Sequence, residues 1–373
     1  MRTPFRPLLK WPGGKTREWP RIAPHLPADI RHFVDPFTGG GAPFGLTPHS
    51  GDAYMNDRHQ RLIALYRGVQ AADQDLASEL HTLADDWNAL APVALSIQSG
   101  FREAVAAHRA QTATDAGALH AALADGLGSR VFGRTIAGER TVLESLLHAV
   151  RDKARRVARL EQRHDVLFDS AQLNAHAETA VRAGYYTLVR AHEHDGTGPA
   201  AVADFVFVRE YCYGSMFRTS RAGRFNIPYG GTSYNGKSFA TRAAQLTAVT
   251  TVDSLAGVAF HEGDFQPFLA SVTAGMDERD FVFVDPPYHS DFSTYGANAF
   301  DLDDHCRLAA VLAALPTRWM QVIKATPEVR ALYSAADMER RGVRIADEFG
   351  KRYGYNVRGR NDRAAQHLVI TNY

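Results

Sequence analysis

The residues best suited to chemistry are Asp285-Pro286-Pro287-Tyr288, which follow the apolar run FVFV at 281–284. Each proline fixes its own φ and lacks an N–H, so the chain leaves this predicted strand in a stiff, extended form. The Asp285 carboxylate and the Pro286 carbonyl then form a pair of acceptors, and Tyr288 adds an aromatic face beside them. This set suits the exocyclic amino group of a planar base. Proline pairs also simply end strands, so the interpretation depends on the motifs described next.

A glycine-rich loop, DPFTGGGAPFG, follows an earlier predicted strand. Phe37, Gly39 and Gly41 are its candidate ligand-binding residues, because glycine allows positive φ and close approach of the backbone to a ligand. The carboxyl end of a first parallel strand is where nucleotides bind. The loop does not complete a dinucleotide fingerprint, because position 44 is Phe44, and GGKT does not complete a P-loop, because position 9 is Leu9. A simple tight turn is the alternative.

Two acidic residues end further predicted strands. Asp57 has the position at which an acid accepts hydrogen bonds from ribose hydroxyls, although it is also suited to cap a helix beginning near Arg58. Asp264 follows a third strand, where it is suited to accept from an adenine amino group while Phe265 packs on the ring.

The elements that must position these residues are strands alternating with helices, which predicts an α/β fold with a mostly parallel sheet covered on both faces. Helical spacing places Leu62, Leu65 and Tyr66 on one face after the second strand, and 302–315 is a further predicted helix. The predicted strands are 31–37, 51–57, 257–264, 280–285, 318–324 and 367–373.

The middle of the chain has a different character. The 373 residues exceed what a single core usually holds, and the Ala-rich stretch from about Ala71 to Asp204 has helical spacing, as in 141–165. We therefore expect a catalytic domain formed by 1–70 and 238–373. A helical insertion at 71–237 interrupts it.

The insertion ends in a segment at 208–237 that is rich in aromatic, glycine and basic residues and reads as a long hairpin or loop. Basic residues among aromatic ones suit a polyanion with stackable faces, although a solvated loop is the alternative. Its expected displayed cations are Arg209, Arg218, Arg221, Arg224 and Lys237, against the single acid Glu210.

A basic stretch between Arg151 and Arg163 leaves the same two alternatives open. It either faces DNA or is a solvated surface, and the interspersed Asp152, Glu161 and Asp165 favour the solvated surface.

The bulk properties narrow the class of protein. The net charge is +1 and the pI about 7.9, so any polyanion must meet local patches. The two cysteines, Cys212 and Cys306, give neither a disulfide framework nor a zinc motif, and HEH at 192–194 reads as solvated loop. We expect no metal and no membrane span. With no secretory leader in the sequence, we also expect a cytoplasmic location.

Taken together, these motifs resemble the Dam-like (D12 class) DNA adenine-N6 methyltransferases. Each motif is modest alone, but all of them in this order form a specific pattern. The resemblance is carried by LLKWPGGK (8–15), FVDPFTGGGAPFG (33–45), NDRHQRLIALY (56–66), YGSMFRTSRAGRFNIPYG (213–230), DPPY (285–288) and NDRAAQHLVITNY (361–373).

The resemblance implies a Rossmann-like S-adenosylmethionine-dependent methyltransferase sheet, with a large helical insertion and a DNA-contacting hairpin. It implies no metal, and it implies a double-stranded DNA substrate. A monomer is expected, with a cognate restriction endonuclease as a candidate partner. The implied contacts to S-adenosylmethionine are Trp11, Lys15, Phe37, Gly39, Gly41, Asp57, Asp264 and Asp285.

The resemblance also implies contacts to DNA. Arg218 matches the arginine that reads a base, Tyr213 the residue that wedges into the duplex, and Lys10 a lysine that helps to read the site. Arg221 and Asn226 lie on the same hairpin. The chain departs from the family at Gly214-Ser215 and Ser220 and in the long insertion, which leaves the recognition sequence open.

The implied reaction flips the adenine out of the duplex. Tyr288 stacks on the base, while Asp285 and the Pro286 carbonyl accept from the amino group during direct methyl transfer, so these three are the predicted catalytic residues. Two alternatives remain. One is an amino-methyltransferase acting on cytosine N4 or RNA, although Asp285 favours adenine. The other is a catalytically weak DNA-binding subunit of a restriction-modification or phage system.

Overall fold

The computed structural model describes residues 5–133, 141–216, 218–220, 223–287, 300–352 and 364–373. The chain forms two compact units. The first, here called the sheet unit, comprises Met1–Ala71, Thr219–Gly223 and Val249–Tyr373. The second, called the helical unit, comprises Ala72–Arg218 and Arg224–Ala248, so it extends beyond the predicted end at 237.

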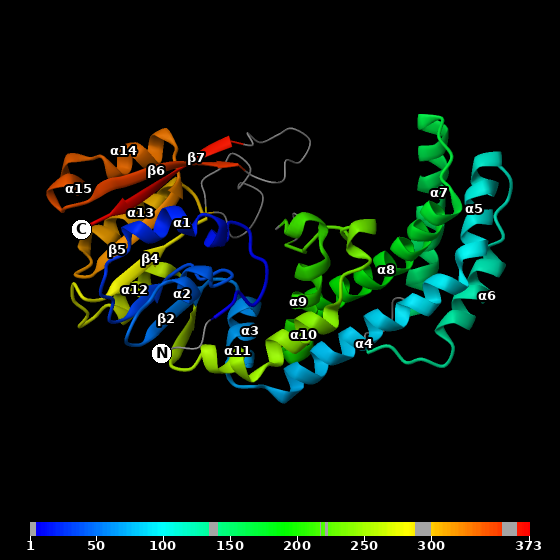
Figure 1. Ribbon diagram of the computed structural model, residues 1–373, viewed down its shortest axis with the longest axis horizontal. Coiled ribbons are helices and arrows are strands. Elements are labelled where there is room, and N and C mark those ends of the chain that lie inside the picture. Colours follow the sequence, from blue (N-terminus) through cyan, green and yellow to red (C-terminus); the bar gives the residue numbers. More distant parts are fainter. Residues whose placement is uncertain (1–4, 134–140, 217, 221–222, 288–299, 353–363) are drawn as a thin grey trace. The chain divides into compact units, whose positions relative to one another are not determined.

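A seven-stranded sheet forms the centre of the sheet unit, in the order β3-β2-β1-β4-β5-β7-β6 (Figure 1). The pairs from β3 to β5 are parallel, whereas β7 is antiparallel to both β5 and β6. The predicted α/β fold is confirmed. The strands are β1 (Phe33–Asp35), β2 (Ala53–Asp57), β3 (Val258–Glu262), β4 (Phe281–Val284), β5 (Arg318–Lys324), β6 (Arg344–Arg352) and β7 (Ala364–Thr371).

Strand β6 has no counterpart among the predicted strands. Its sequence, RIADEFGKR, has too few apolar residues to read as a buried run, and its pairing with β7 shifts register between Ile345 and Asp347. It stands at the end of the strand order, where polar residues are tolerated because one edge has no neighbouring strand among the described residues.

Apolar side chains cover both faces of the sheet. On one face, strand residues such as Val282 and Val284 share a core with helices α12, α13 and α14. On the other, Phe33 packs on Phe44 of α2. The helices of this unit are η1 (Lys15–Arg17), α1 (Trp19–Ile22), η2 (Ala23–His25), α2 (Ala42–Leu46), α3 (Gln60–Gln70), α11 (Val249–Ser254), α12 (Phe265–Val272), α13 (Leu302–Ala314), α14 (Pro327–Tyr333) and α15 (Ala336–Arg340).

The strand order creates a switch point between β1 and β4. The chain runs from β1 to β2 and β3 on one side and then returns to form β4 on the other side of β1. In open α/β sheets, ligands bind at the carboxyl ends of the strands where the order reverses in this way. The residues that follow β1 and β4 are therefore at the expected place for a site.

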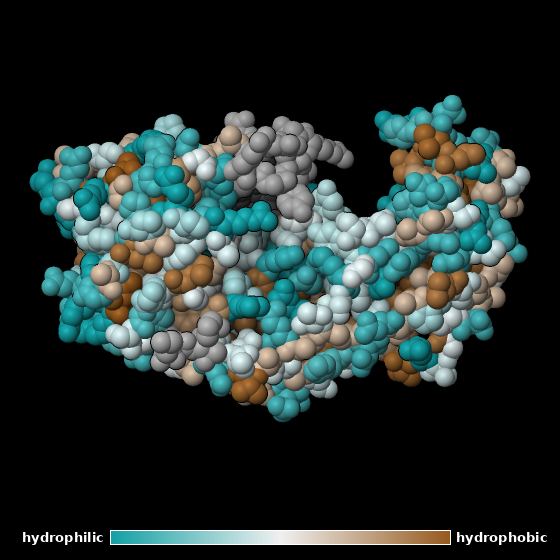
Figure 2. Space-filling view, viewed as in Figure 1, coloured by the Kyte–Doolittle hydropathy of each residue, from teal (hydrophilic) through white to brown (hydrophobic). Residues whose placement is uncertain are grey.

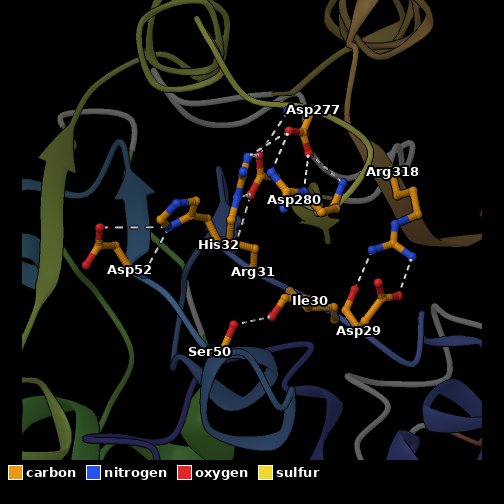
Figure 3. Close-up of polar contacts among 10 residues, drawn as sticks. Asp29, Ile30, Arg31, His32, Ser50, Asp52, Asp277, Asp280 and Arg318 are labelled. Carbon is orange, nitrogen blue, oxygen red and sulfur yellow. Dashed lines mark hydrogen bonds and ion pairs between the residues drawn. The ribbon is translucent and has the colours of Figure 1, made fainter.

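Ion pairs lie at the amino ends of β1, β4 and β5 (Figure 3). Arg31, before β1, donates from Nε to Oδ1 of the fully buried Asp280 at 2.8 Å, and Arg318 of β5 donates to Oδ1 of Asp29 at 3.1 Å. Burial alone would raise the pKa of Asp280, but hydrogen bonds from Arg31 and from backbone N–H groups lower it. The charges drawn at this end thus pair with one another and stabilise the strand starts.

The helical unit has its own aromatic core. The Trp87 ring packs on both Tyr211 and Phe207, with ring centroids at 4.2 and 5.2 Å, and Arg182 lies over its ring at 4.6 Å. Figure 1 shows α5, α6 and α7 side by side at one end of this unit. Its helices are α4 (Gln74–Ser96), α5 (Gln98–Ala110), α6 (Ala116–Leu127), α7 (Val142–His164), α8 (Ser170–Asp195), α9 (Gly198–Tyr211), η3 (Tyr213–Ser215), η4 (Thr232–Tyr234) and α10 (Phe239–Thr247).

Part of the predicted hairpin is helical, because α9 continues to Tyr211. The hairpin begins with an antiparallel bridge between Cys212 and Tyr229. The N–H of Asn226 donates to the carbonyl of Arg218 at 3.1 Å, which keeps its two sides together further along.

Candidate active site and nucleic-acid interface

Asp285, the first residue after β4, forms an ion pair with Lys15. The Nζ–Oδ2 distance is 2.5 Å, and Lys15 is fully buried and also donates to the carbonyl of Gly13 at 2.8 Å. Burial raises the pKa of Asp285, whereas the charge and hydrogen bond of Lys15 oppose this rise. The pair therefore favours the carboxylate form, which accepts hydrogen bonds. Lys15 was expected to contact the cofactor, and the structure places it on Asp285 instead of on an open surface.

The carbonyl of the buried Pro286 accepts no hydrogen bond from any residue in the described ranges. A backbone carbonyl is a strong hydrogen-bond acceptor, so this oxygen is suited to accept from a ligand. It follows directly after Asp285, as the sequence predicts. Tyr288, the third predicted catalytic residue, lies outside the described residues.

The glycine loop lets the N-terminal segment approach the end of β1. Gly39 and Gly41 have φ of 49° and 74°, a conformation that side chains with a Cβ rarely adopt. A Cβ on Gly39 would lie 2.6 Å from Cδ1 of Trp11, and one on Gly41 would lie 2.6 Å from Oη of Tyr66. At these two glycines, the groups that approach the backbone closely are therefore the side chains of Trp11 and Tyr66. These contacts hold Trp11 at the glycine loop.

Asp57, at the end of β2, is oriented by backbone donors. Its Oδ2 accepts from the N–H of Gly39 at 3.0 Å, and its Oδ1 accepts from the N–H of His59 at 2.9 Å. The cap of α3 is His59, whose Nδ1 accepts from Leu62, so the capping alternative for Asp57 is wrong. Burial raises the pKa of Asp57 despite these bonds. A carboxylate has about four acceptor positions, so these backbone bonds leave capacity for a ligand.

Asp35, at the end of β1, brings a third carboxyl group to this edge of the sheet. It is fully buried; Oδ1 accepts from the N–H of Phe37 at 3.0 Å, and Oδ2 has no hydrogen-bond partner among the described residues. Burial, followed by the charges of Asp285 and Asp57, raises its pKa well above the usual value. The sequence marked Asp35 as a strand end, and its burial beside two other acids is the feature that sequence reasoning missed.

Asp264 is engaged by a partner that the sequence did not indicate. Both of its oxygens accept from Arg307 of α13, at 2.8 and 2.9 Å, and Oδ1 also caps α12. The hydrogen bond from Arg307 is the largest cause of its lowered pKa. Phe265 is buried against Phe37 and Phe300, with Arg307 over its ring at 4.5 Å. Contact of Asp264 and Phe265 with adenine therefore stays a prediction, and it requires side chains that are already packed or paired.

A buried network lies near the Lys15–Asp285 pair. Glu18 forms an ion pair with Lys351 of β6 at 2.5 Å, and its Oε2 lies 3.2 Å from Nδ1 of His367 of β7. Burial alone would raise the pKa of Glu18, but the hydrogen bond from His367 and the charge of Lys15 lower it. Burial lowers the pKa of His367. No sequence motif signals these residues, because they come from distant segments.

On the hairpin of the helical unit, Arg218 is oriented by Asn226. The Nε of Arg218 donates to Oδ1 of Asn226 at 2.8 Å, and the Arg218 side chain is exposed. Tyr213 is 48% exposed, as a residue that contacts DNA must be. Arg221 lies outside the described residues. In the sheet unit, Lys10 is exposed.

The expectation that Arg209 is displayed is wrong. Arg209 belongs to α9, is 1% exposed, and donates to the carbonyls of Ser215 and Met216 at 2.9 and 2.7 Å. It therefore supports the base of the hairpin from inside. Lys237 is also partly buried, where it donates to the carbonyl of Glu210 at 2.9 Å and pairs with its carboxylate.

Within the described ranges, no cluster of at least three His, Cys, Asp or Glu side chains is arranged to hold a metal ion. A search of the same residues finds no helix with the length and apolarity needed to cross a membrane.

The sheet with its switch point, the glycine loop after β1 and the acids at the ends of β1, β2 and β4 have the organisation of the Rossmann-like methyltransferases. The sequence model of the D12 class N6 adenine-specific DNA methyltransferases matches residues 11–92 and 151–345. The chain belongs to this family, which confirms the resemblance and the adenine-specific DNA methyltransferase activity inferred from it.

Relatives agree with this assignment. The chain is 23% identical over 377 residues to the type II methyltransferase M.CviBI of Paramecium bursaria Chlorella virus NC1A, covering 99% of this chain and 100% of that protein. It is 23% identical over 326 residues to the type II methyltransferase M.MjaIII of Methanocaldococcus jannaschii, covering 84% and 81%. It is 30% identical over 132 residues to the retron Ec67 DNA adenine methylase of Escherichia coli, covering 35% and 43%.

Proposed function

We propose that the protein methylates N6 of a flipped adenine in double-stranded DNA, with Asp285 and the Pro286 carbonyl accepting hydrogen bonds from the amino group. The carrying observation is the pair of acceptors at the end of β4: the carboxyl group of Asp285, whose charged form Lys15 favours, and the carbonyl of the buried residue Pro286, which has no partner in the described part of the chain. Acceptors placed where positive charge develops on nitrogen lower the barrier to its alkylation.

Three features support S-adenosylmethionine as the methyl donor. Oδ2 of Asp35 is buried without a partner among the described residues, which suits a donor or cation. Asp57 offers free lone pairs at the place where nucleotide folds hold ribose hydroxyls. Trp11 adds an aromatic surface at the glycine loop. When bound, the cofactor would supply an electrophilic methyl group on a cationic sulfonium, and the carboxyl groups of Asp35, Asp57 and Asp285 would supply acceptors at this edge of the sheet.

The hairpin is proposed to read the duplex. The Arg218 guanidinium has the paired donors that recognise guanine in the major groove. Oδ1 of Asn226 orients this group by accepting a hydrogen bond from Nε of Arg218. Tyr213 has the exposure needed to fill the gap that a flipped base leaves. Flipping costs a few kcal/mol, which contacts of this kind must offset.

The test is Asp285→Ala, with Asp303→Ala on the exposed start of α13 as the matched control. We expect Asp285→Ala to lose methyl transfer from labelled S-adenosylmethionine while it still binds DNA, and Asp303→Ala to behave as the wild type. Full activity of Asp285→Ala would remove the assignment. Mass spectrometry of the digested DNA separates N6-methyladenine from N4-methylcytosine, and an RNA substrate tests the remaining alternative.

The names of the relatives also lead us to propose a type II modification role with a cognate restriction endonuclease. We further propose that the protein acts as a monomer. Single-molecule sequencing of DNA from cells that express the protein tests this role. One short sequence methylated throughout is the expected result, and scattered N6-methyladenine contradicts it. Sedimentation of the purified protein tests the monomer.

A further inference from the structure

Helix α7 of the helical unit carries a stripe of arginines on its outer face. Arg151, Arg155, Arg159 and Arg163 follow one another at intervals of four residues, about one helical turn, and all four are exposed. The opposite face is buried in the unit through Leu146, Val150, Ala154, Val157, Ala158 and Glu161. The stripe, here called the α7 stripe, is thus held outward by the packing of the helix.

Few acids neutralise the α7 stripe. Glu161, which in the sequence appeared to interrupt the basic run, is 3% exposed and faces inward. There it accepts from Arg109 of α5 at 3.2 Å and from the N–H of Phe168 at 3.0 Å. Asp152 pairs with Arg155 at 3.2 Å. In the described ranges, the other three arginines of the stripe form no ion pair. Among the described residues, Glu161 and Asp152 therefore leave most of the positive charge of the stripe unpaired.

Helix α5 packs beside α7, and one of its side chains responds to the charge of the stripe. His108 of α5 lies near the stripe, and its pKa is lowered by burial and then by the charges of Arg155, Arg159 and Arg151. The lowered pKa of His108 thus indicates that the positive charges of these three arginines act at the same place. Like charges held this close repel one another, and a polyanion removes that repulsion.

We propose that the α7 stripe is a second DNA-contacting surface, which binds the phosphates of the duplex outside the recognition sequence. From Arg151 to Arg163 the stripe covers twelve helical steps, about 18 Å, which corresponds to about five base pairs of duplex. Arginines without acidic partners neutralise phosphates and release counterions, a contribution that does not depend on sequence. The inference rests on the proposed function in taking duplex DNA as the partner.

A protein partner is the competing occupant of this end of the unit. Leu160, Val166 and Leu167 are exposed at the end of α7 and just after it. Figure 2 shows hydrophilic residues over much of this end, with hydrophobic ones among them. DNA is favoured because the charge extends along the helix, whereas the exposed apolar residues named here gather at its end.

The experiment measures binding of the full-length protein to a labelled duplex of mixed sequence, about 40 base pairs long, over a range of salt concentrations. The variant carries Arg151→Gln, Arg159→Gln and Arg163→Gln. A control carries Arg279→Gln, Arg340→Gln and Arg341→Gln in the sheet unit, which removes the same charge from arginines that pair with Asp277 or Asp337. Circular dichroism verifies that both are folded.

The plot of log K against log salt falls with rising salt. We expect it to be shallower by about 2 to 3 in the stripe variant, since each phosphate contact contributes about 0.9 to its steepness. The control should keep the wild-type slope, and lysines at the three stripe positions should restore it. An unchanged slope in the stripe variant would overturn the inference and leave the surface to a protein partner or to solvent. Methyl transfer to DNA by the wild type, measured in parallel, separates this failure from failure of the proposed function.

Discussion

At the scale of single residues, the charge state of Asp285 depends on two opposing influences. Burial favours the neutral acid, and Lys15 favours the carboxylate. Because the proposed chemistry uses the carboxylate as an acceptor, methylation should fall as the pH drops through the raised pKa of Asp285. The acid side of the pH profile is therefore expected above the usual titration range of aspartate, which is near pH 3.9.

Lys15→Gln should move this acid limb to higher pH. The substitution removes the positive charge that holds down the pKa of Asp285, so more of the acid is neutral at any given pH. Single-turnover methylation measured from about pH 5 to pH 9 tests this, with Lys15→Arg as the variant that keeps the charge. A rate lowered equally at every pH would contradict it and indicate that Lys15 acts on cofactor binding.

Gly39→Ala should weaken cofactor binding by displacing Trp11. The added Cβ would lie 2.6 Å from Cδ1 of Trp11, and the positive φ adds strain of about 1 kcal/mol. Gly275→Ala is the matched control, because Gly275 has a φ of 87° with nothing within 4 Å of its Cβ position. Calorimetry with S-adenosylmethionine should show weaker binding in Gly39→Ala alone. Equal losses of affinity in both variants would assign the effect to backbone strain.

At the scale of elements, the hairpin depends on a contact between its two sides. Arg218→Ala should relax discrimination at one base pair by about 1–3 kcal/mol. Asn226→Ala should act in the same direction but less, because it removes the acceptor that orients Nε of Arg218. Methylation rates on duplexes with single base changes measure both.

The control is Arg224→Ala, which removes another exposed hairpin arginine and should lower the rates on all duplexes alike. If Arg218→Ala keeps the wild-type base preference, Arg218 does not read a base.

The sequence predicts the elements that have a strong local signal. The run FVFV became a strand buried at all four positions, and the helical spacing of Leu62, Leu65 and Tyr66 became the buried face of α3. Strand β6 was not predicted because an edge strand needs few apolar residues. Arg209 was misplaced because α9 continues into the segment that was read as a loop.

The candidate site was predictable to the extent that strand ends determine it. Parallel strands bring their carboxyl ends to one edge, so Asp57 and Asp285 could be placed from the chain alone. Their partners could not. Lys15 lies 270 residues from Asp285, and Arg307 reaches Asp264 from another helix. Such pairs follow from packing between distant segments, which spacing within a motif does not show.

At the scale of the whole molecule, each compact unit has its own core, so a cofactor bound to the sheet unit should stabilise that unit. A ligand at a hundred times its Kd contributes about 2.7 kcal/mol to the state that binds it. Hydrogen exchange with S-adenosylmethionine should slow the amides of β1 and β4 and leave those of α4 and α8 unchanged. Equal slowing in both units would show that they unfold as one.

Strand β6 has a consequence for the behaviour of the protein at high concentration. An exposed strand edge is a template for pairing with another molecule, and charged side chains discourage such pairing. The charges of β6 include Asp347 and Glu348, which bind Arg21 and Arg330, and Lys351, which binds Glu18. We therefore expect the polar composition that concealed this strand in the sequence also to discourage edge-to-edge pairing between molecules.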